Sequence, residues 1–168
     1  MPDPNVDFDK VGLLTVRDGK ILLCRKKHTT SLLILPGGCR EPGESAIDCL
    51  SRELREELGD VVVSAVELVG VYTDRAAGPE TAQPKTVRIE LYQGDLTGEP
   101  VARSEIAELV WFGERDDCLQ LAPSIAHKIL PDLLARGILA WGAANHAKTV
   151  SNSSGSGRSA AAASQPNS

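Results

Sequence analysis

The sequence predicts an α/β domain, and three observations support this class. Short apolar runs rich in β-branched residues, typical of strands, are interspersed with two longer segments of helical periodicity. The length of 168 residues is that of one domain. The composition, 42% hydrophobic and 24% charged, is that of a chain that folds around a core. The expected strands cover residues 11–16, 21–24, 32–35, 61–73, 86–94 and 110–112, and the expected helices cover residues 45–58 and 123–136.

The first half of the chain carries clear local signals. Asp18-Gly19 between two apolar runs predicts a two-residue hairpin turn. The apolar run 32–35 is stopped by Pro36-Gly37-Gly38. For the helix over residues 45–58, Ser45 suits the N-cap and Gly59 suits the stop after the last turn.

The second half contains longer elements. Residues 61–73 form a run long enough to bend or to split into two strands. A Gly/Pro/Ala loop is expected over residues 75–84. The helix over residues 123–136 begins with Pro123, and we expect Pro131 to kink or divide it.

The charge distribution disfavours polymeric nucleic acid as a partner. The formal net charge is −5, and residues 143–168 contribute only two charged side chains, both basic, so residues 1–142 are more acidic than the whole chain. An acidic body with 4% aromatic residues is a poor match for polymeric DNA or RNA. A small anionic ligand stays possible if metal ions mediate its binding.

Domain organisation and location follow from composition. Residues 1–142 are expected to form the domain, and the Ser/Gly/Ala-rich residues 143–168 are expected to form a disordered tail. No apolar run reaches the ~18–20 residues of a membrane span, and the N-terminus lacks the basic and apolar parts of a secretory signal. The four cysteines lack zinc-site spacing and are interpreted as reduced thiols, so we expect a cytoplasmic protein without a membrane partner.

The helix over residues 45–58 carries an unfavourable arrangement of charge. One stripe is apolar and should pack on the sheet; it contains Ile47, Leu50, Leu54 and Leu58. A second stripe contains Glu53, Glu56 and Glu57, which repel one another near the helix end where the dipole disfavours anions. Such a cluster of oxygen ligands suits Mg²⁺ or Mn²⁺. The competing interpretation is a solvated acidic face, with Arg52 and Glu56 forming an ordinary surface pair.

The residues upstream of this helix favour the metal interpretation. Pro36-Gly37-Gly38 lets the backbone pass close to a ligand and expose a carbonyl group. Glu44 adds another carboxylate just before the helix. Together, the loop and the helix form an arrangement suited to oxygen coordination.

Residues 38–60, GCREPGESAIDCLSRELREELGD, resemble the Nudix box, Gly-x5-Glu-x7-Arg-Glu-U-x-Glu-Glu-x-Gly-U, where U is aliphatic. The matching positions are Gly38, Glu44, Arg52, Glu53, Leu54, Glu56, Glu57 and Gly59. The departure is Asp60, which stands where the final aliphatic residue belongs. The similarity of layout extends over roughly residues 5–142.

The resemblance implies a fold and an activity. The fold is an α/β/α sandwich around a mixed β-sheet, and the activity is a metal-dependent pyrophosphohydrolase that cleaves a nucleoside diphosphate linked to another moiety. The implied Mg²⁺ ligands, with Mn²⁺ as a substitute, are Glu53, Glu56, Glu57 and the Gly37 carbonyl. Arg52 would hold the glutamates by ion pairing. Glu44 would be either a water-mediated ligand or a support for Arg52.

The general base and the substrate contacts are left open by the sequence. Candidates for the base are a helix glutamate such as Glu53, or Glu105, which is otherwise a surface carboxylate. Arg25 and Lys26, with Lys27 beside them, could receive phosphate or could simply be a solvated strand end. A base could stack on Tyr72, Trp111 or Phe112, although the last two are also suited to the core.

The resemblance leaves two classes of function. The first is hydrolysis of a nucleoside triphosphate, including an oxidised one, or of a nucleotide sugar such as ADP-ribose. The second is a catalytically silent scaffold that senses a nucleotide or binds a partner, although no glutamate of the box is missing. Decapping of mRNA is disfavoured by the acidic body. Oligomeric state has no signal in the sequence.

Overall fold

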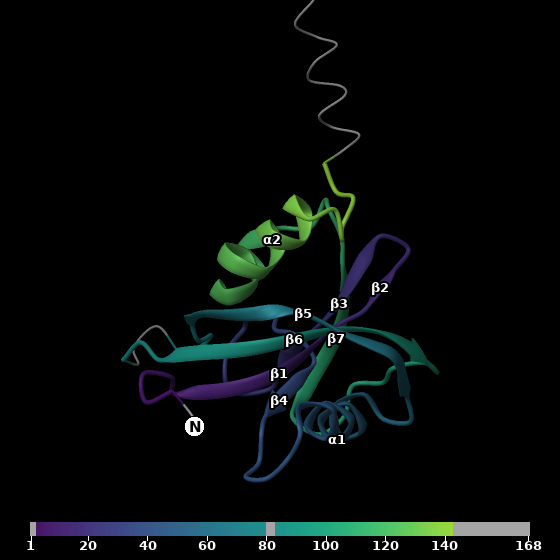
Figure 1. The fold of residues 1–168 in the computed structure, drawn as a ribbon. Helices are drawn as coiled ribbons and strands as arrows, with labels where there is room; N and C mark the ends of the chain where they lie inside the picture. The colour runs from purple at the N-terminus through teal and green to yellow at the C-terminus, as the bar shows by residue number, and fades with distance from the viewer. Residues whose placement is uncertain (1–2, 80–82, 143–168) are drawn as a thin grey trace, which may run out of the picture.

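A computed structural model describes residues 3–79 and 83–142, which form three layers (Figure 1). Strands make up the middle layer, helix α1 covers one side and helix α2 the other. The strands are β1 (Phe8–Leu14), β2 (Val16–Arg17), β3 (Lys20–Lys26), β4 (Gly37–Cys39), β5 (Val62–Arg75), β6 (Thr86–Thr97) and β7 (Ile106–Phe112). The helices are α1 (Ala46–Leu58), the 3-10 turn η1 (Cys118–Gln120), the π-helix η2 (Ile125–Ile129) and α2 (Leu130–Ala135). The expected sandwich is confirmed.

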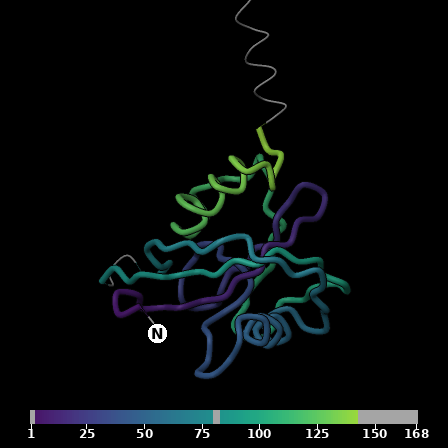
Figure 2. The backbone as a smooth tube through the Cα atoms, in the orientation of Figure 1, coloured from purple at the N-terminus to yellow at the C-terminus, as the bar shows by residue number. Residues whose placement is uncertain are grey.

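The strands form two sheets. The four-stranded sheet has the order β4-β1-β6-β5, and the three-stranded sheet has the order β2-β3-β7. Strands β1 and β6 are parallel, and the other pairs are antiparallel, so the arrangement is mixed. The chain path in Figure 2 shows these two strands side by side although they are far apart in the sequence.

The hairpin turn is confirmed, but the first expected strand is divided. Asp18 and Gly19 have φ angles of 53° and 72°, as a two-residue turn with left-handed residues requires. Residues 11–16 belong to two strands, because the chain passes from one sheet to the other at Thr15. The buried Thr15 accepts a hydrogen bond from the Leu22 N–H (3.2 Å), which holds this crossing in place.

Residues 32–35 do not form a strand, so this expectation was wrong. They make two isolated bridges, Cys24 with Ile34 and Leu33 with Leu121. The run is apolar because Leu33 and Leu35 are buried in the core. Burial alone therefore explains the pattern that suggested strand pairing.

Strand β5 bends without splitting. Its pairing with β6 shifts register between Ser64 and Glu67 and again between Leu68 and Gly70. Such bulges insert unpaired residues and turn the strand. The second helical segment is divided as Pro131 predicted, because the helix changes from π to α at Leu130.

The core has two parts, one on each side of the strands. Helix α1 contributes Cys49, Leu50, Leu54 and Leu58 to one cluster, while η2 and α2 pack on the other. Ile47 was expected in the apolar stripe but is 43% exposed. Within residues 3–79 and 83–142, no helix has the length and apolar character needed to cross a membrane. The boundary predicted at residue 142 is not tested, since residues 143–168 lie outside the described part.

Candidate metal and phosphate site

Helix α1 presents its glutamates to strand β4. The Ser45 side chain caps the helix by accepting from the Asp48 N–H (3.1 Å), and Gly59, with φ of 80°, ends it, so both helix boundaries are confirmed. The Cys49 thiol lies 3.7 Å from the Gly38 carbonyl oxygen, which shows how closely the helix approaches β4.

Glu57 is the buried carboxylate of the site, with 2% of its surface exposed. The Gly37 N–H donates to its Oε2 (3.0 Å), while Oε1 is buried without a hydrogen-bond partner in the described structure. Burial raises the pKa of Glu57 to about 7, and Glu53 adds to the rise; the Gly37 N–H opposes it. An unpaired buried carboxylate oxygen is costly, and a cation would remove this cost.

Glu53 lies directly over Gly38. A Cβ atom at Gly38 would be 2.3 Å from the Glu53 Cδ and within 2.6 Å of both carboxylate oxygens. Glycine at this position therefore leaves room for the Glu53 carboxylate, which any side chain would displace. The sequence motif contained Gly38 but gave no sign of this contact.

Arg52 connects the helix to the loop before it. Its Nε and Nη2 donate to the two oxygens of Glu44 (2.7 and 2.8 Å), and its Nη1 donates to Glu53 Oε1 (2.7 Å). Nη2 also donates to the Cys39 carbonyl (3.2 Å). The Arg52 hydrogen bonds lower the pKa of Glu44 to about 2. Glu44 thus lies in the position of a support for Arg52.

Glu56 is more exposed than the other two helix carboxylates. Its side chain is 56% exposed, and its nearest charged partner is Arg52, at 3.8 Å. In the described part of the chain, no three His, Cys, Asp or Glu side chains stand together in a geometry ready for a metal ion. Glu57 and Glu53 offer hard oxygen donors that fit a divalent cation, and Glu56 must turn to join them.

Lys26 and Glu105 meet beside Glu57. The Lys26 Nζ is 3.3 Å from Glu105 Oε1, and the Lys27 N–H donates to the Glu105 carbonyl (2.9 Å). Both side chains act on Glu57, since Lys26 lowers its pKa and Glu105 raises it. Two segments far apart in the sequence, the end of β3 and the turn before β7, therefore meet in an ion pair that influences Glu57 of α1.

Arg25 is not brought to these carboxylates. Its Nε donates to Glu108 (2.6 Å), and its other nitrogens donate to the Ser31 carbonyl and to Gln120 (3.4 Å). The guanidinium thus braces the segment after β3 against β7 and η1. Of the two cations predicted to contact substrate, Lys26 is the one beside the site.

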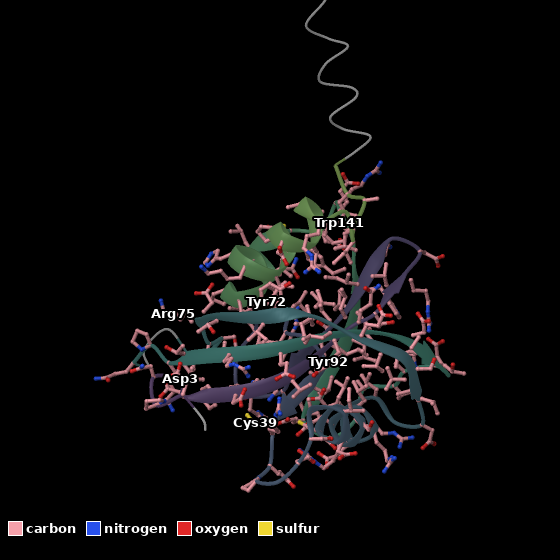
Figure 3. The ribbon with its side chains drawn as sticks, viewed as in Figure 1. Asp3, Cys39, Tyr72, Arg75, Tyr92 and Trp141 are labelled. Atoms are coloured by element: carbon pink, nitrogen blue, oxygen red, sulfur yellow. The ribbon has the colours of Figure 1, made fainter. Side chains whose placement is uncertain are left out.

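A cavity of about 230 Å³ adjoins Lys26 on the α2 side of the four-stranded sheet. Its lining includes Phe8, Lys10 and Thr30, which sequence reasoning missed. The three aromatic residues expected to stack a base do not line it, and Tyr72 instead donates to Asp132 of α2 (2.6 Å; Figure 3 labels Tyr72 beside this helix). Both Phe8 and Lys10 lie on β1 before the first strand expected from the sequence, which began at residue 11; side chains two residues apart on a strand share a face.

A larger cavity of about 630 Å³ lies on the other face of β1 and β6. Four of its charged side chains form ion pairs, Arg40 with Glu90 (2.6 Å) and Arg88 with Asp9 (2.8 Å). These ion pairs join neighbouring strands β4, β1 and β6, so their evident role is to hold the sheet together.

Comparison with known proteins gives consistent results. The sequence model of the NUDIX domain matches residues 8–133. The chain is 31% identical over 121 residues to YvcI of Bacillus subtilis (strain 168), named an uncharacterized Nudix hydrolase, covering 71% of this chain and 74% of that protein. It is 32% identical over 135 residues to the NAD-capped RNA hydrolase NudC of Pseudomonas putida (strain GB-1), covering 79% of this chain but only 46% of NudC.

Solved structures show the same fold. The E. coli ORF135 protein superposes with a TM-score of 0.60 at 28% identity, covering 80% of this chain and 94% of that one. A MutT NUDIX hydrolase from Burkholderia pseudomallei superposes with a TM-score of 0.56 at 27% identity, covering 66% and 85%. A protein from Nitrosomonas europaea has a TM-score of 0.61 at 24% identity, covering 76% and 88%, which concerns the fold alone.

Proposed function

Because this chain belongs to the Nudix hydrolase family, which acts on pyrophosphate bonds, we propose that it cleaves the diphosphate linkage of a small nucleotide derivative with a divalent cation. The observation that carries the proposal is Glu57, a buried carboxylate with one unpaired oxygen beside Glu53. Mg²⁺, or Mn²⁺ in its place, would be held by Glu53, Glu56, Glu57 and the Gly37 carbonyl. When bound, such an ion neutralises phosphate oxygens and activates water.

The protein's own side chains would then perform three tasks. Arg52 holds Glu53 in place and is itself held by Glu44. Lys26 binds a phosphate oxygen at the mouth of the 230 Å³ cavity, which receives the nucleoside. Glu105 removes a proton from the attacking water, because it lies beside Lys26 and close enough to Glu57 to affect its ionisation.

We propose that this protein acts on a narrower class of substrates than the family as a whole. A cavity of this size favours a single nucleoside, as in a nucleoside triphosphate, oxidised or not, or in one half of ADP-ribose. Relatives named for NAD-capped RNA are about twice as long as the aligned region, and we propose that this acidic chain acts on free nucleotides. We also propose a cytoplasmic location, since all four cysteines are free.

A substrate panel with product identification tests the proposal. Nucleoside triphosphates, 8-oxo-dGTP, ADP-ribose, NAD and NAD-capped RNA are compared in Mg²⁺ and in Mn²⁺. We expect cleavage of a free nucleotide at the diphosphate bridge, lost by on the order of 100-fold or more in Glu53→Gln. Glu67→Gln, an exposed carboxylate on β5, is the matched control.

Two results would contradict the proposal. Cleavage of the capped RNA alone would exclude a small free substrate. Full activity of Glu53→Gln together with a lowered melting temperature in EDTA would make this glutamate structural and would remove it from the site.

A further inference from the structure

Lys10 is a cation that the proposed mechanism does not use. It lies on β1, two residues after Phe8, and its backbone partners are Cys39 on β4 and Ile89 on β6. All four residues line the 230 Å³ cavity. Lys10 therefore belongs to the wall of the space proposed for the nucleoside, with its ammonium group 5.7 Å from the centre of the ring of Phe8, another lining residue.

The lining of this cavity is rich in hydrogen-bond donors. Its floor is apolar, with side chains such as Ile34, Val87 and Ile89. Its polar side chains are two lysines, three hydroxyls and the Cys39 thiol, and no carboxylate or carboxamide is among the described lining residues. The chain as a whole has more acidic residues (23) than basic residues (18), so the described lining differs from the rest of the protein in its charge. Lysine ammonium groups donate and never accept.

Lys10 has no counter-ion among residues 3–79 and 83–142, since no carboxylate there lies within ion-pair distance of it. Its Nζ is 5.7 Å from the centre of the Phe8 ring, a weak cation–π contact. Lys26, by contrast, is paired with Glu105. A half-buried cation without an acceptor is costly, and a ligand that offers an oxygen would offset that cost.

Lys26 links the Lys10 side of the cavity to the proposed metal site. It lines the same cavity as Lys10 and forms an ion pair with Glu105 (3.3 Å). A substrate with its phosphates at Lys26 would therefore place its nucleoside within reach of Lys10.

We propose that Lys10 determines base specificity, selecting bases with a carbonyl oxygen at pyrimidine position 4 or purine position 6 over bases with an amino group there. The inference rests on the proposed function and narrows its substrate class to uracil-, thymine-, guanine- or hypoxanthine-type nucleotides. The carbonyl oxygen accepts from the Lys10 ammonium. An amino group in the same place sets donor against donor and leaves both unpaired.

Equilibrium binding of nucleoside monophosphates in EDTA tests the inference without catalysis. UMP and CMP differ at position 4 of one ring, and IMP and AMP differ at position 6 of another. We expect the wild-type protein to bind UMP and IMP about tenfold or more tightly than CMP and AMP, the usual effect of a hydrogen bond to a charged group.

Variants of Lys10 and Lys85 show whether Lys10 causes the binding preference. Lys10→Met should reduce both preferences to about twofold or less. Lys10→Gln, which offers an acceptor as well as a donor, should raise the relative affinity for CMP and AMP. Lys85→Met is the matched control, because Lys85 approaches the same Phe8 ring (5.3 Å) without lining this cavity, and it should keep both preferences.

The outcomes separate this inference from the proposed function. Equal binding within both pairs, or a preference that survives Lys10→Met and Lys10→Gln, would overturn the role of Lys10 while leaving hydrolysis untouched. Failure of all four monophosphates to bind would also overturn it. Loss of hydrolysis for every nucleotide, with the binding preference intact, would instead contradict the proposed function.

Discussion

Glu57 is the side chain in which the proposed site has the clearest effect on the surroundings of a single residue. Its carboxylate is buried, one oxygen accepts from the Gly37 N–H, and the other has no partner among the described residues. The neighbouring Leu54 and Leu58 belong to the apolar cluster of α1, so Glu57 adds a buried carboxylate beside apolar side chains. The residue therefore destabilises the metal-free protein, and its ionisation should be visible in stability.

The metal-free protein should lose stability as the pH rises from about 4.5 to about 7. In this range folded Glu57 retains a proton that the unfolded chain has released, so deprotonation favours unfolding. The loss should approach about 3 kcal/mol. Denaturant unfolding in EDTA at several pH values measures it, and Glu57→Gln should flatten this slope. Identical slopes in the two proteins would mean that the Glu57 pKa is close to its ordinary value.

Glu105→Gln should lower kcat by about 10²–10⁴, the usual range for a general base, while Mn²⁺ affinity stays near that of the wild type. The reason is that Glu105 lies beside Lys26, whereas the proposed metal oxygens come from α1 and Gly37. Kinetics and the paramagnetic signal of Mn²⁺ measure the two effects separately.

Glu108→Gln is the control for this variant, because Glu108 lies three residues further on, within β7, and pairs with Arg25. It should retain most of the activity. Unchanged kcat in Glu105→Gln would return Glu105 to a surface role. A matching loss of Mn²⁺ affinity would make it a metal ligand instead.

At the scale of elements, the site depends on the contact between α1 and β4. Gly38→Ala should reduce kcat by more than tenfold, because the new Cβ would occupy the space of the Glu53 carboxylate. Gly78→Ala is the control, since a Cβ there meets nothing within 4 Å. Activity and thermal melting are measured for both. A Gly38→Ala enzyme with full activity would show that Glu53 can move without consequence.

Leu50→Ala should destabilise the protein by about 2–5 kcal/mol, because the Leu50 side chain on α1 is fully buried. Ile47→Ala should change stability by about 0.5 kcal/mol or less, since Ile47 is exposed. Chemical denaturation of the two variants checks this difference. Equal losses would show that Ile47 packs as the helical periodicity suggested.

Local sequence signals predicted where helices and turns begin and end better than they predicted which elements pack against one another. Ser45, Gly59 and Asp18-Gly19 act within a few residues, so the helix limits and the hairpin followed from the sequence. The error at Ile47 has a long-range cause. At the first turn α1 meets β4 on the Cys49 side, and Ile47 faces away from that contact.

The motif predicted the carboxylates but not their unequal environments. The sequence placed three glutamates on one stripe, whereas the fold buries Glu57, sets Glu53 over Gly38 and leaves Glu56 exposed. The cavity could not be predicted, because Lys10 comes from β1 and the other lining residues come from β3, β4, β6 and the segments that follow β3, follow β5 and precede η2. The elements that meet around the cavity are set by the pairing of β1 with β6, two strands that are far apart in the sequence.

At the scale of the whole molecule, the last described residues are held against the strands by specific contacts. Trp141 packs its ring against Phe112 at a centroid distance of 6.1 Å and donates its indole N–H to the Gly19 carbonyl (2.6 Å; Figure 3 labels Trp141 above the strands). Gly142 donates to Glu114 (2.7 Å). These contacts tie the end of the described chain to the β2–β3 turn and to the end of β7 with the residues after it.

Truncation after Gly142 should leave kcat/KM and the melting temperature unchanged, because every group proposed for catalysis lies before that residue. Substrate kinetics and thermal melting of the shortened protein test this prediction. A truncation that also removes Trp141 should lower the melting temperature and serves as the positive control. A substantial loss of kcat/KM on removing residues 143–168 alone would give that segment a part in substrate binding.

The hydrogen bond from Gly37 to Glu57 has a practical consequence for spectroscopy. The amide proton of Gly37 points at the carboxylate whose charge the proposed reaction depends on. Its chemical shift will therefore change when that carboxylate gains a proton, and again when it gains a cation. A single amide resonance thus reports the occupancy of the site from the strand that faces it.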